Sequence, residues 1–515
     1  MKKIIYIISI ALCAAAATSC SGFLDEKPLS NITDKNYYKT EADAEGAINA
    51  IYETVGIGSV TAYTGTGNAN TPYGGLFFNV YWIIQDLFAD NASHDNWLYA
   101  NFDNFSIDET DGNIKTLWYS FYRAINTCNI AISRIPSIDM DEVKRNHLVG
   151  EARFWRGLMY GEMVKFWGDV PLCQAPTEGV DKLFGVERSN QITVLEEALE
   201  DLQFAIDNLK DNYRAGYGRA NSVIAQAVYA KVAMILASKT GSSEDWDKVV
   251  KNCEKVISSK KFSLYKTFAE NFLISNEHGP ESVLSINYQN TADLWGSQFN
   301  VALLPSDILA NSPDGSEGPS NANYWIVPTD NLYKSFEEGD TRRDVTIMKD
   351  YTYKNGSTLV FAESAKYPYY YSKYWDRNAE PKGLNSDQNY PYMRYSEVLL
   401  MYAEALNELN NGPTTEAYGA INLVRDRAFQ DNGSGAHALS SLSYAQFRKA
   451  ILDERRWELA LEGSRWFDLV RLSDDFSAEI KKSKPNSYVA DKNKLLPIPQ
   501  YERLLNSNIT QNEGY

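Results

Sequence analysis

Apolar residues recur at i, i+3 and i+4 along most of the chain, a spacing that places them on one face of an α-helix. This spacing predicts helices at residues 41–55, 80–89, 114–134, 141–167, 193–209, 221–238, 245–258, 395–409, 415–429 and 443–472. The stretch 262–381 is different, because Gly, Pro, Asn and Ser interrupt it repeatedly. Its short apolar pieces at 282–288 and 357–363 predict small strands. The pattern therefore predicts a mostly α-helical protein with a loop-rich, partly irregular insertion.

Two pairs of consecutive helices are predicted to form hairpins. Alanines recur along 221–238, where they allow a neighbouring helix to approach closely, and a turn at Gly241 leads into 245–258. The helices 395–409 and 415–429 repeat this arrangement around a Gly-Pro turn. Such hairpins are similar to tetratricopeptide units, although no fixed period runs through the whole chain. We therefore expect a tetratricopeptide-like scaffold of helix hairpins.

The N-terminus has the pattern of an export signal. Two lysines precede an apolar run at 4–17, which at about 1.5 Å per residue is too short to cross a bilayer core of about 30 Å. Ala17, Thr18 and Ser19 lead directly into Cys20, an order that resembles the processing site of bacterial lipoproteins. The sequence therefore predicts cleavage before Cys20 and lipidation of its thiol. The alternative is a plain secreted protein that is cut at the same place.

These signals divide the chain into four segments. The predicted organisation is a lipoprotein signal peptide at 1–19, a lipidated tether at 20–36, an N-terminal helical part at 37–260, and a C-terminal part at 261–515 that contains the loop-rich stretch 262–381. The tether is polar and has no helical periodicity. We expect the N-terminal and C-terminal parts to form one compact unit.

Charge content argues against nucleic acid as a partner, and cysteine content indicates how the fold is stabilised. Removal of residues 1–19 leaves 48 Lys and Arg against 67 Asp and Glu, a net charge of −19, with no basic stripe that could bind nucleic acid. Three cysteines then remain besides Cys20, namely Cys128, Cys173 and Cys253. Because three cysteines cannot form a complete disulfide framework in an exported chain, we expect packing to stabilise the fold.

Four stretches in register carry a resemblance to a known family. They are FLDEKP at 23–28, EARFWRGLMYGEMVKFWGDVPL at 151–172, ILDERRWELALEGSRWFDLVRL at 451–472 and LLPIPQYERLLNSNITQNEGY at 495–515. Together they resemble the SusD/RagB family, outer-membrane lipoproteins of Bacteroidetes. The resemblance implies a lipid anchor in the cell outer membrane, exposure at the surface, a glycan ligand and a SusC-like TonB-dependent transporter as partner. It also implies that the C-terminal tail packs back over the scaffold.

The motifs give little support for catalysis. A predicted helical face carries Glu454, Glu458 and Glu462, which we expect to be bridged by Arg455, Arg456 and Arg471. Such arginines lower carboxyl pKa values, the wrong direction for the general acid of a glycosidase. None of the histidines has the paired spacing of a zinc site. We expect neither an enzyme nor a cofactor, and a structural calcium ion at the acidic stretch 108–113 stays an open alternative.

Candidate ligand-binding residues stand in two parts of the chain that are rich in Tyr and Trp. Sugar rings need flat aromatic faces with polar side chains beside them, usually on loops. The candidates are Asp95, Asn96, Trp97 and Tyr99 in the first part, and Trp295, Tyr324 and Trp325 in the second. The alternative for each aromatic residue is a buried anchor for its loop or a contact with the transporter.

Three functions follow from these patterns. The first is a cell-surface protein that binds oligosaccharides or polysaccharides without cleaving them and delivers them to the transporter. The second is a peptide-binding lipoprotein of the RagB kind, in which main-chain pairing would replace aromatic stacking. The third and weakest is an exported glycoside hydrolase.

Overall fold

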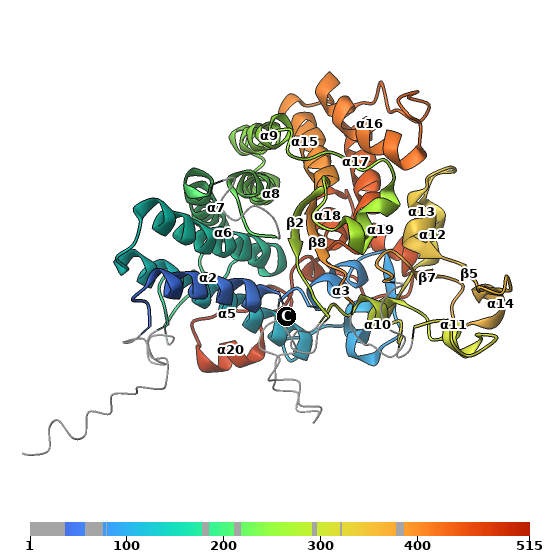
Figure 1. The fold of residues 1–515 in the computed structure, drawn as a ribbon, viewed down its shortest axis with the longest axis horizontal. Coiled ribbons are helices and arrows are strands. Elements are labelled where there is room, and N and C mark those ends of the chain that lie inside the picture. Colours follow the sequence, from blue (N-terminus) through green and yellow to red (C-terminus); the bar gives the residue numbers. More distant parts are fainter. Residues whose placement is uncertain are drawn as a thin grey trace, which may run out of the picture.

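The computed structural model describes residues 37–56, 76–78, 80–177, 185–210, 218–290, 296–319, 322–376 and 386–515. Helices make up most of this part of the chain, and its strands are short and lie in antiparallel pairs. The prediction of a mostly α-helical protein is confirmed (Figure 1).

The larger helices form the scaffold, and most of the shorter elements lie in the insertion and near the C-terminus. The scaffold helices are α2 (Glu41–Val55), α3 (Val80–Leu87), α5 (Gly112–Arg134), α6 (Glu142–Trp167), α7 (Gln191–Asn208), α8 (Ser222–Thr240), α9 (Ser243–Ser258), α15 (Tyr395–Asn410), α16 (Thr415–Phe429), α17 (Tyr444–Glu458) and α18 (Arg465–Leu472). The shorter helices are η2 (Trp97–Tyr99), α4 (Ala100–Asp103), η3 (Ile135–Ser137), η5 (Phe268–Phe272), η6 (Ile274–Asn276), α10 (Phe299–Leu303), α11 (Asp307–Ala310), α12 (Asp330–Ser335), α13 (Arg342–Thr346), α14 (Phe361–Ser364), α19 (Phe476–Ser483), η7 (Asp491–Lys494) and α20 (Gln500–Leu505). The strands pair as β1 (Ala92–His94) with β3 (Ile326–Pro328), β2 (Ser282–Ile286) with β8 (Tyr390–Arg394), β4 (Ile347–Met348) with β7 (Tyr370–Tyr371), and β5 (Asp350–Thr352) with β6 (Thr358–Val360).

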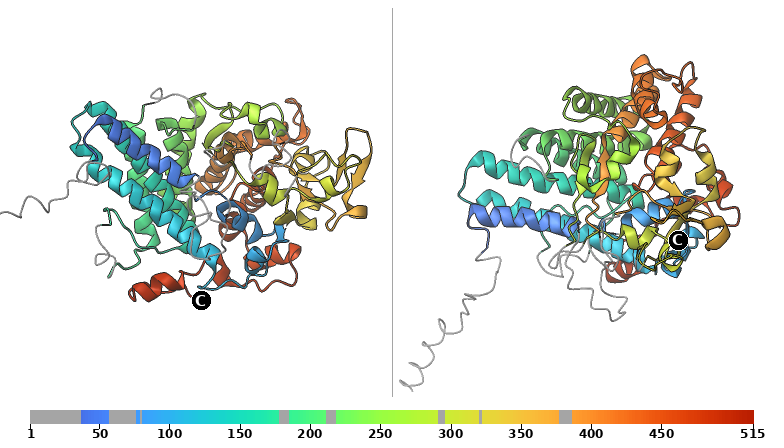
Figure 2. Two further views of the ribbon diagram at one scale, coloured as in Figure 1. Left: turned by 60° about the horizontal axis from the view of Figure 1, so that its bottom comes forward. Right: turned by 45° about the vertical axis from the view of Figure 1, so that its right-hand side comes forward.

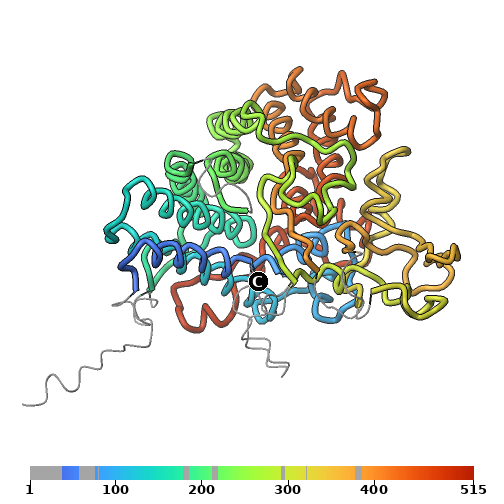
Figure 3. Tube along the Cα trace, viewed as in Figure 1, coloured from blue at the N-terminus to red at the C-terminus, as the bar shows by residue number. Residues whose placement is uncertain are grey.

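The scaffold helices pack against one another largely in chain order. Helices α5 to α9 form an array on one side of the molecule, and the insertion with α10 to α14 lies on the other side (Figures 1 and 2). The chain leaves α9, passes through the insertion and returns to α15, which packs against α9 (Figure 3). The hairpins predicted on both sides of the insertion are confirmed as α8–α9 and α15–α16.

Helix α8 is the centre of this array. In the described part of the chain it is the one helix that is long and apolar enough to cross a membrane, but 72% of the relevant window is buried inside the protein. Its neighbours α7, α9 and α15 cover it. Gly241 ends the helix in the left-handed conformation with a φ of 65°, at the turn that the sequence predicts. Helix α8 is therefore a core helix of the scaffold.

Glycines in α6 allow its neighbours to approach closely. A Cβ atom on Gly157 would lie 2.7 Å from the carbonyl oxygen of Ala198 in α7, and one on Gly161 would lie 2.7 Å from a methyl group of Val232 in α8. Both distances are shorter than a normal van der Waals contact. The absence of side chains at these positions therefore sets the spacing of three helices.

We expect Gly157→Ala to lower the free energy of unfolding by about 1–3 kcal/mol, because the backbone of α7 would have to move. Gly419→Ala in α16 is the matched control, since a Cβ there meets nothing within 4 Å. The control should stabilise the protein by about 0.5–1 kcal/mol through lower chain entropy. Urea denaturation measures both changes, and equal effects would contradict this packing argument.

Two elements differ in extent from what the sequence predicts. The helix predicted at 443–472 is two helices, α17 and α18, because Leu461 and Gly463 have φ values of 64° and 69°. The amide of Leu461 donates outside the helix, to the buried carboxylate of Asp86 at 3.1 Å. The strand predicted at 357–363 is confirmed only for β6, since α14 begins at Phe361. A continuous apolar period thus hides a turn that tertiary contacts stabilise.

The C-terminal tail packs back over the scaffold. Residues 495–499 run beside the end of α6, where the amide of Leu496 donates to the carbonyl of Phe166 at 2.7 Å. The indole of Trp167 donates to the carbonyl of Pro497 at 3.1 Å. Helix α20 then begins at Gln500 and lies near α5 (Figure 2). These contacts confirm the position that the family resemblance implies for the tail.

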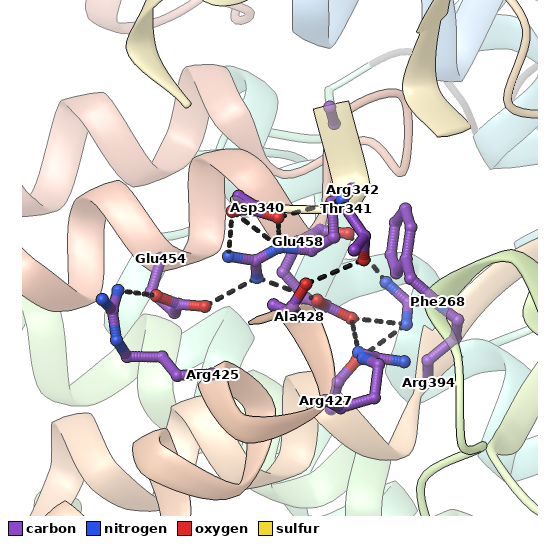
Figure 4. A network of polar contacts seen from close by, with 12 residues as sticks. Phe268, Asp340, Thr341, Arg342, Arg394, Arg425, Arg427, Ala428, Glu454 and Glu458 are labelled. Carbon is purple, nitrogen blue, oxygen red and sulfur yellow. Dashed lines mark hydrogen bonds and ion pairs between the residues drawn. The ribbon is translucent and has the colours of Figure 1, made fainter. Parts of the chain in front are cut away.

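A set of buried ions joins the insertion to α16 and α17, and we call it the buried ion network. Its members are Glu281, Asp340, Arg342, Lys373, Arg394, Arg425, Arg427, Glu454, Glu458 and Glu462. Arg394 of β8 donates to Glu281, Glu458 and Glu462 at 2.7–2.8 Å. Arg342 of α13 donates to Glu454 and Glu458 (Figure 4). The network thus fixes β8 and α13 onto α17.

The carboxylates on α17 have other partners than the sequence suggests. Arg455 and Arg471 both bind Asp468, and Arg456 binds Asp90, whereas the network arginines come from distant segments. The expected bridges by Arg455, Arg456 and Arg471 to the three glutamates are therefore wrong. Spacing along one helix does not reveal partners that the tertiary fold supplies.

The pKa shifts of these glutamates differ in direction. Burial alone would raise the pKa of Glu458, but Arg427 and Arg394 outweigh it and hold the pKa well below its usual range. For Glu454, burial outweighs Arg342 and Arg425, so its pKa is raised, opposite to our expectation. Both side chains are fully buried and bound by arginines on both oxygens. Because these carboxylates are not exposed to solvent, Glu454 and Glu458 have a structural role.

Candidate ligand-binding surface

Strand pairing brings the two predicted ligand-binding segments together. Strands β1 and β3 pair with Ala92 opposite Pro328 and His94 opposite Ile326. Beyond the paired strands, the amide of Asp95 donates to the carbonyl of Trp325 at 2.9 Å. Residues separated by more than two hundred positions in the sequence are therefore neighbours. We call Asp95, Asn96, Trp97, Tyr324 and Trp325 the aromatic loop surface.

Trp97 is the most exposed part of this surface. Trp97, at the start of η2, is 81% exposed, the highest value among the exposed large hydrophobic residues of the described ranges. The side chain of Asn96 caps η2 by accepting a hydrogen bond from the amide of Leu98 at 3.0 Å. The cap fixes the backbone from which the indole projects. A large aromatic face held in water by a fixed backbone is typical of a binding surface.

Tyr99 is buried next to Trp325 and does not belong to the exposed surface. It is only 3% exposed, and its ring lies 6.3 Å from that of Trp325, centre to centre. Burial, with a smaller contribution from Asp111, raises the pKa of its hydroxyl. Tyr99 therefore anchors its loop in this conformation, which was the alternative for each aromatic residue, and it presents no face to solvent.

Tyr324 and Trp325 are half-buried and rest on other aromatic rings. The ring of Tyr324 meets those of Tyr367 and Tyr370 edge-on, at centre distances of 6.2 and 5.4 Å. These rings belong to a second, smaller core around Ile308, Val327 and Phe361, separate from the main core of the scaffold. The insertion thus has its own packed base beneath the aromatic loop surface.

Lys366 and Tyr367 extend the site beyond the residues found in the sequence. The hydroxyl of Tyr367 donates to the carboxylate of Asp95 at 2.5 Å, and Lys366 forms an ion pair with the same carboxylate. The bond to Asp95 raises the pKa of Lys366, and burial followed by Asp95 raises that of Tyr367. The tyrosine-rich stretch at 367–371 was the available sequence signal, but nothing in it indicates contact with Asp95.

The carboxylate of Asp103 contacts two side chains near the loop that carries Trp97. Nδ1 of His94 lies 2.9 Å from the carboxylate of Asp103, and Nζ of Lys484 lies 2.6 Å from it. Burial alone would raise the pKa of Asp103, but Lys484 and His94 outweigh it and lower the pKa. These contacts hold His94 and Asp103, on the two sides of the loop that carries Trp97, against Lys484 of the C-terminal part.

Two predicted residues lie outside the described residues. These are Trp295, the remaining aromatic candidate, and Cys20, the predicted lipidation site. Their roles stay predictions.

The described ranges contain no group of three or more His, Cys, Asp or Glu side chains that could hold a metal ion. In the acidic stretch 108–113, each carboxylate already has a partner. Asp108 binds Thr110, Asp111 caps α5, and Glu109 binds Arg503 and Gln511. These bonds engage the carboxylates of the stretch, and a structural calcium ion there stays an open alternative.

Comparisons with known proteins identify the family and the fold of the chain. Residues 262–515 match a family described as the SusD family, and residues 22–235 match one described as "Starch-binding associating with outer membrane". The SusD-like protein P2 of Formosa agariphila is 28% identical, and the match covers 100% of both chains.

Solved structures of similar fold include a SusD homolog from Bacteroides thetaiotaomicron, with a TM-score of 0.76, 22% identity, and coverage of 94% of this chain and 99% of that one. A laminarin binding SusD-like protein has a TM-score of 0.73, 23% identity, and coverage of 93% and 100%. The two family matches extend from residue 22 to the last residue with one gap. The chain therefore belongs to the SusD/RagB family.

Proposed function

We propose that this protein binds oligosaccharides or polysaccharides at the outer surface of the cell and delivers them to a SusC-like TonB-dependent transporter. Family membership supports the proposal, and one relative of the same fold is named as laminarin binding. The observation that carries it in this chain is the exposed indole of Trp97 beside half-buried Trp325 and Tyr324.

The aromatic loop surface suits a sugar chemically. A flat indole covers the apolar C–H face of a pyranose ring, and amide, hydroxyl and ammonium groups satisfy its hydroxyls. Asn96 supplies such a group in the surface itself, and Lys366 and Tyr367 supply others beside it. Because the Lys366 ion pair with Asp95 already balances the local charge, the surface favours a neutral glycan.

Binding without cleavage is part of the proposal. The one carboxylate of the surface, Asp95, already accepts bonds from Lys366 and Tyr367, and the glutamates of α17 are fully buried. Incubation of the protein with the polysaccharide that it binds should release no reducing ends above a protein-free blank. Turnover that scales with protein concentration would instead support a hydrolase.

The anchor is tested by changing Cys20. We expect Cys20→Ala to leave the membrane fraction, because acyl chains contribute about 0.8 kcal/mol per buried methylene and no other anchor is proposed. Ser21→Ala keeps the thiol and is the matched control, which should stay with the membrane. Immunoblots of fractionated cells measure both, and a Cys20→Ala variant that stays in the membrane fraction would refute lipidation.

The transporter is tested by purification from the native membrane. A tagged chain extracted in mild detergent should copurify with a TonB-dependent outer-membrane barrel, identified by mass spectrometry. Recovery of the chain alone, under conditions that preserve other membrane complexes, would contradict delivery through such a partner.

A further inference from the structure

A cavity away from the aromatic loop surface has the character of a binding site. It has a volume of about 440 Å³ and lies between α5, the loop that follows α6, and the C-terminal helix α20. Helix α20 and the insertion helix α14 lie toward opposite ends of the molecule in Figure 1. The volume falls in the range of about 300–1,000 Å³ that is usual for small-molecule sites. None of the residues that line the cavity belongs to the aromatic loop surface, so the two sites are separate.

The walls of the cavity are mostly aromatic and aliphatic. Trp118, Tyr119 and Tyr122 line it from α5, and Leu505 and Ile509 line it from the C-terminal segment. The rings of Trp118 and Tyr122 lie 5.0 Å apart. The hydroxyl of Tyr122 donates to the carbonyl of Pro171 at 2.8 Å, which fixes this wall to the loop after α6. The cavity is therefore preformed.

Two opposite charges also line this cavity. They are the guanidinium of Arg123 and the carboxylate of Glu502, and both side chains are half-buried. Within the described ranges, neither makes a side-chain hydrogen bond or an ion pair closer than 4.0 Å, to each other or to another residue. Burial raises the pKa of Glu502, against a smaller opposite effect of Lys115. Half-buried charges beside apolar walls keep only part of their hydration, so a ligand with complementary charges can replace the lost contacts with water.

The amide side chains of the cavity are already engaged. Oδ1 of Asn126 accepts from the amide of Thr177 at 3.0 Å, and Nδ2 of Asn129 donates to the carbonyl of Cys173 at 2.8 Å. The selectivity of the cavity therefore rests on Arg123 and Glu502. A neutral glycan would leave both charges unpaired, and a ligand with a single charge would leave one.

We propose that this cavity binds a small zwitterion with an apolar body, such as an amino acid or a dipeptide. Its carboxylate binds the planar guanidinium of Arg123, and its ammonium group binds Glu502. Its apolar part packs against Trp118 and Tyr122. The proposal stands apart from glycan binding and does not depend on it.

Isothermal titration of the mature chain with alanylphenylalanine tests the proposal. The same peptide with an acetylated amine and an amidated carboxylate is the matched probe without charges. We expect the free peptide to bind, and the blocked peptide to bind at least about tenfold more weakly, as loss of charged hydrogen bonds requires. Equal binding of the two peptides, or no binding of the free peptide at millimolar concentration, would overturn the proposal.

Variants of the two charged residues locate the site. Arg123→Gln and Glu502→Gln should each weaken binding of the free peptide about tenfold or more and leave binding of the blocked peptide unchanged. Because neither side chain has a partner in the described ranges, both variants should melt as the parent does. Trp97→Ala should not change peptide affinity, which separates this site from the aromatic loop surface. Unchanged affinity in both glutamine variants would refute the assignment.

Discussion

Arg394→Met is expected to lower the free energy of unfolding by about 3–5 kcal/mol, the cost of breaking a buried ion pair on one side. Arg394 is 2% exposed and donates to Glu281, Glu458 and Glu462, and also to the carbonyl of Glu458. Methionine keeps much of the side-chain volume but leaves three buried carboxylates with less positive charge. Chemical denaturation followed by circular dichroism measures the loss.

The matched control breaks an exposed ion pair of similar length. Nζ of Lys334 lies 2.7 Å from Asp330, and their side chains are 68% and 59% exposed. We expect Lys334→Met to change stability by less than about 0.5 kcal/mol, because water and salt screen such pairs. A similar effect of both substitutions would contradict the view that the buried ion network holds the insertion in place.

The second large effect is expected from Trp97→Ala, which should weaken glycan binding by at least about 2 kcal/mol, or about 30-fold. The indole is the most exposed aromatic group at the aromatic loop surface, so its loss removes the face on which a sugar ring would stack. Because it packs against little of the protein, the melting temperature should stay unchanged. Isothermal titration with the bound oligosaccharide measures the affinity.

Tyr501→Ala is the control for this experiment. Tyr501 is also an exposed aromatic residue, 51% exposed, but it belongs to α20. Its substitution should leave glycan affinity unchanged. Equal losses in the two variants would indicate non-specific contact of the glycan with exposed rings.

Local patterns in the sequence were sufficient to predict most of the scaffold helices. The helical period and the turn at Gly241 depend on neighbouring residues, and the structure confirms them. The break between α17 and α18 could not be predicted in the same way. It depends on Asp86, which lies far away in the sequence and accepts the amide of Leu461.

The candidate site was predictable only as two separate segments. Aromatic residues beside polar ones indicate Trp97 and Trp325, but their proximity follows from the pairing of β1 with β3. Periodicity within either segment carries no information about that pairing. For the same reason the sequence did not reveal Lys366 and Tyr367, because their partner Asp95 is distant in the sequence. It also made Tyr99 look like a ligand contact, although the fold buries it beneath Trp325.

The most direct test of the account is affinity electrophoresis of the mature chain and Trp97→Ala in gels that contain plant, host or microbial polysaccharides. We expect at least one polysaccharide to retard the parent chain, and the retardation to be lost in Trp97→Ala but kept in Tyr501→Ala. If no polysaccharide retards the parent chain, or if Trp97→Ala migrates with it, the proposed glycan site at the aromatic loop surface is wrong.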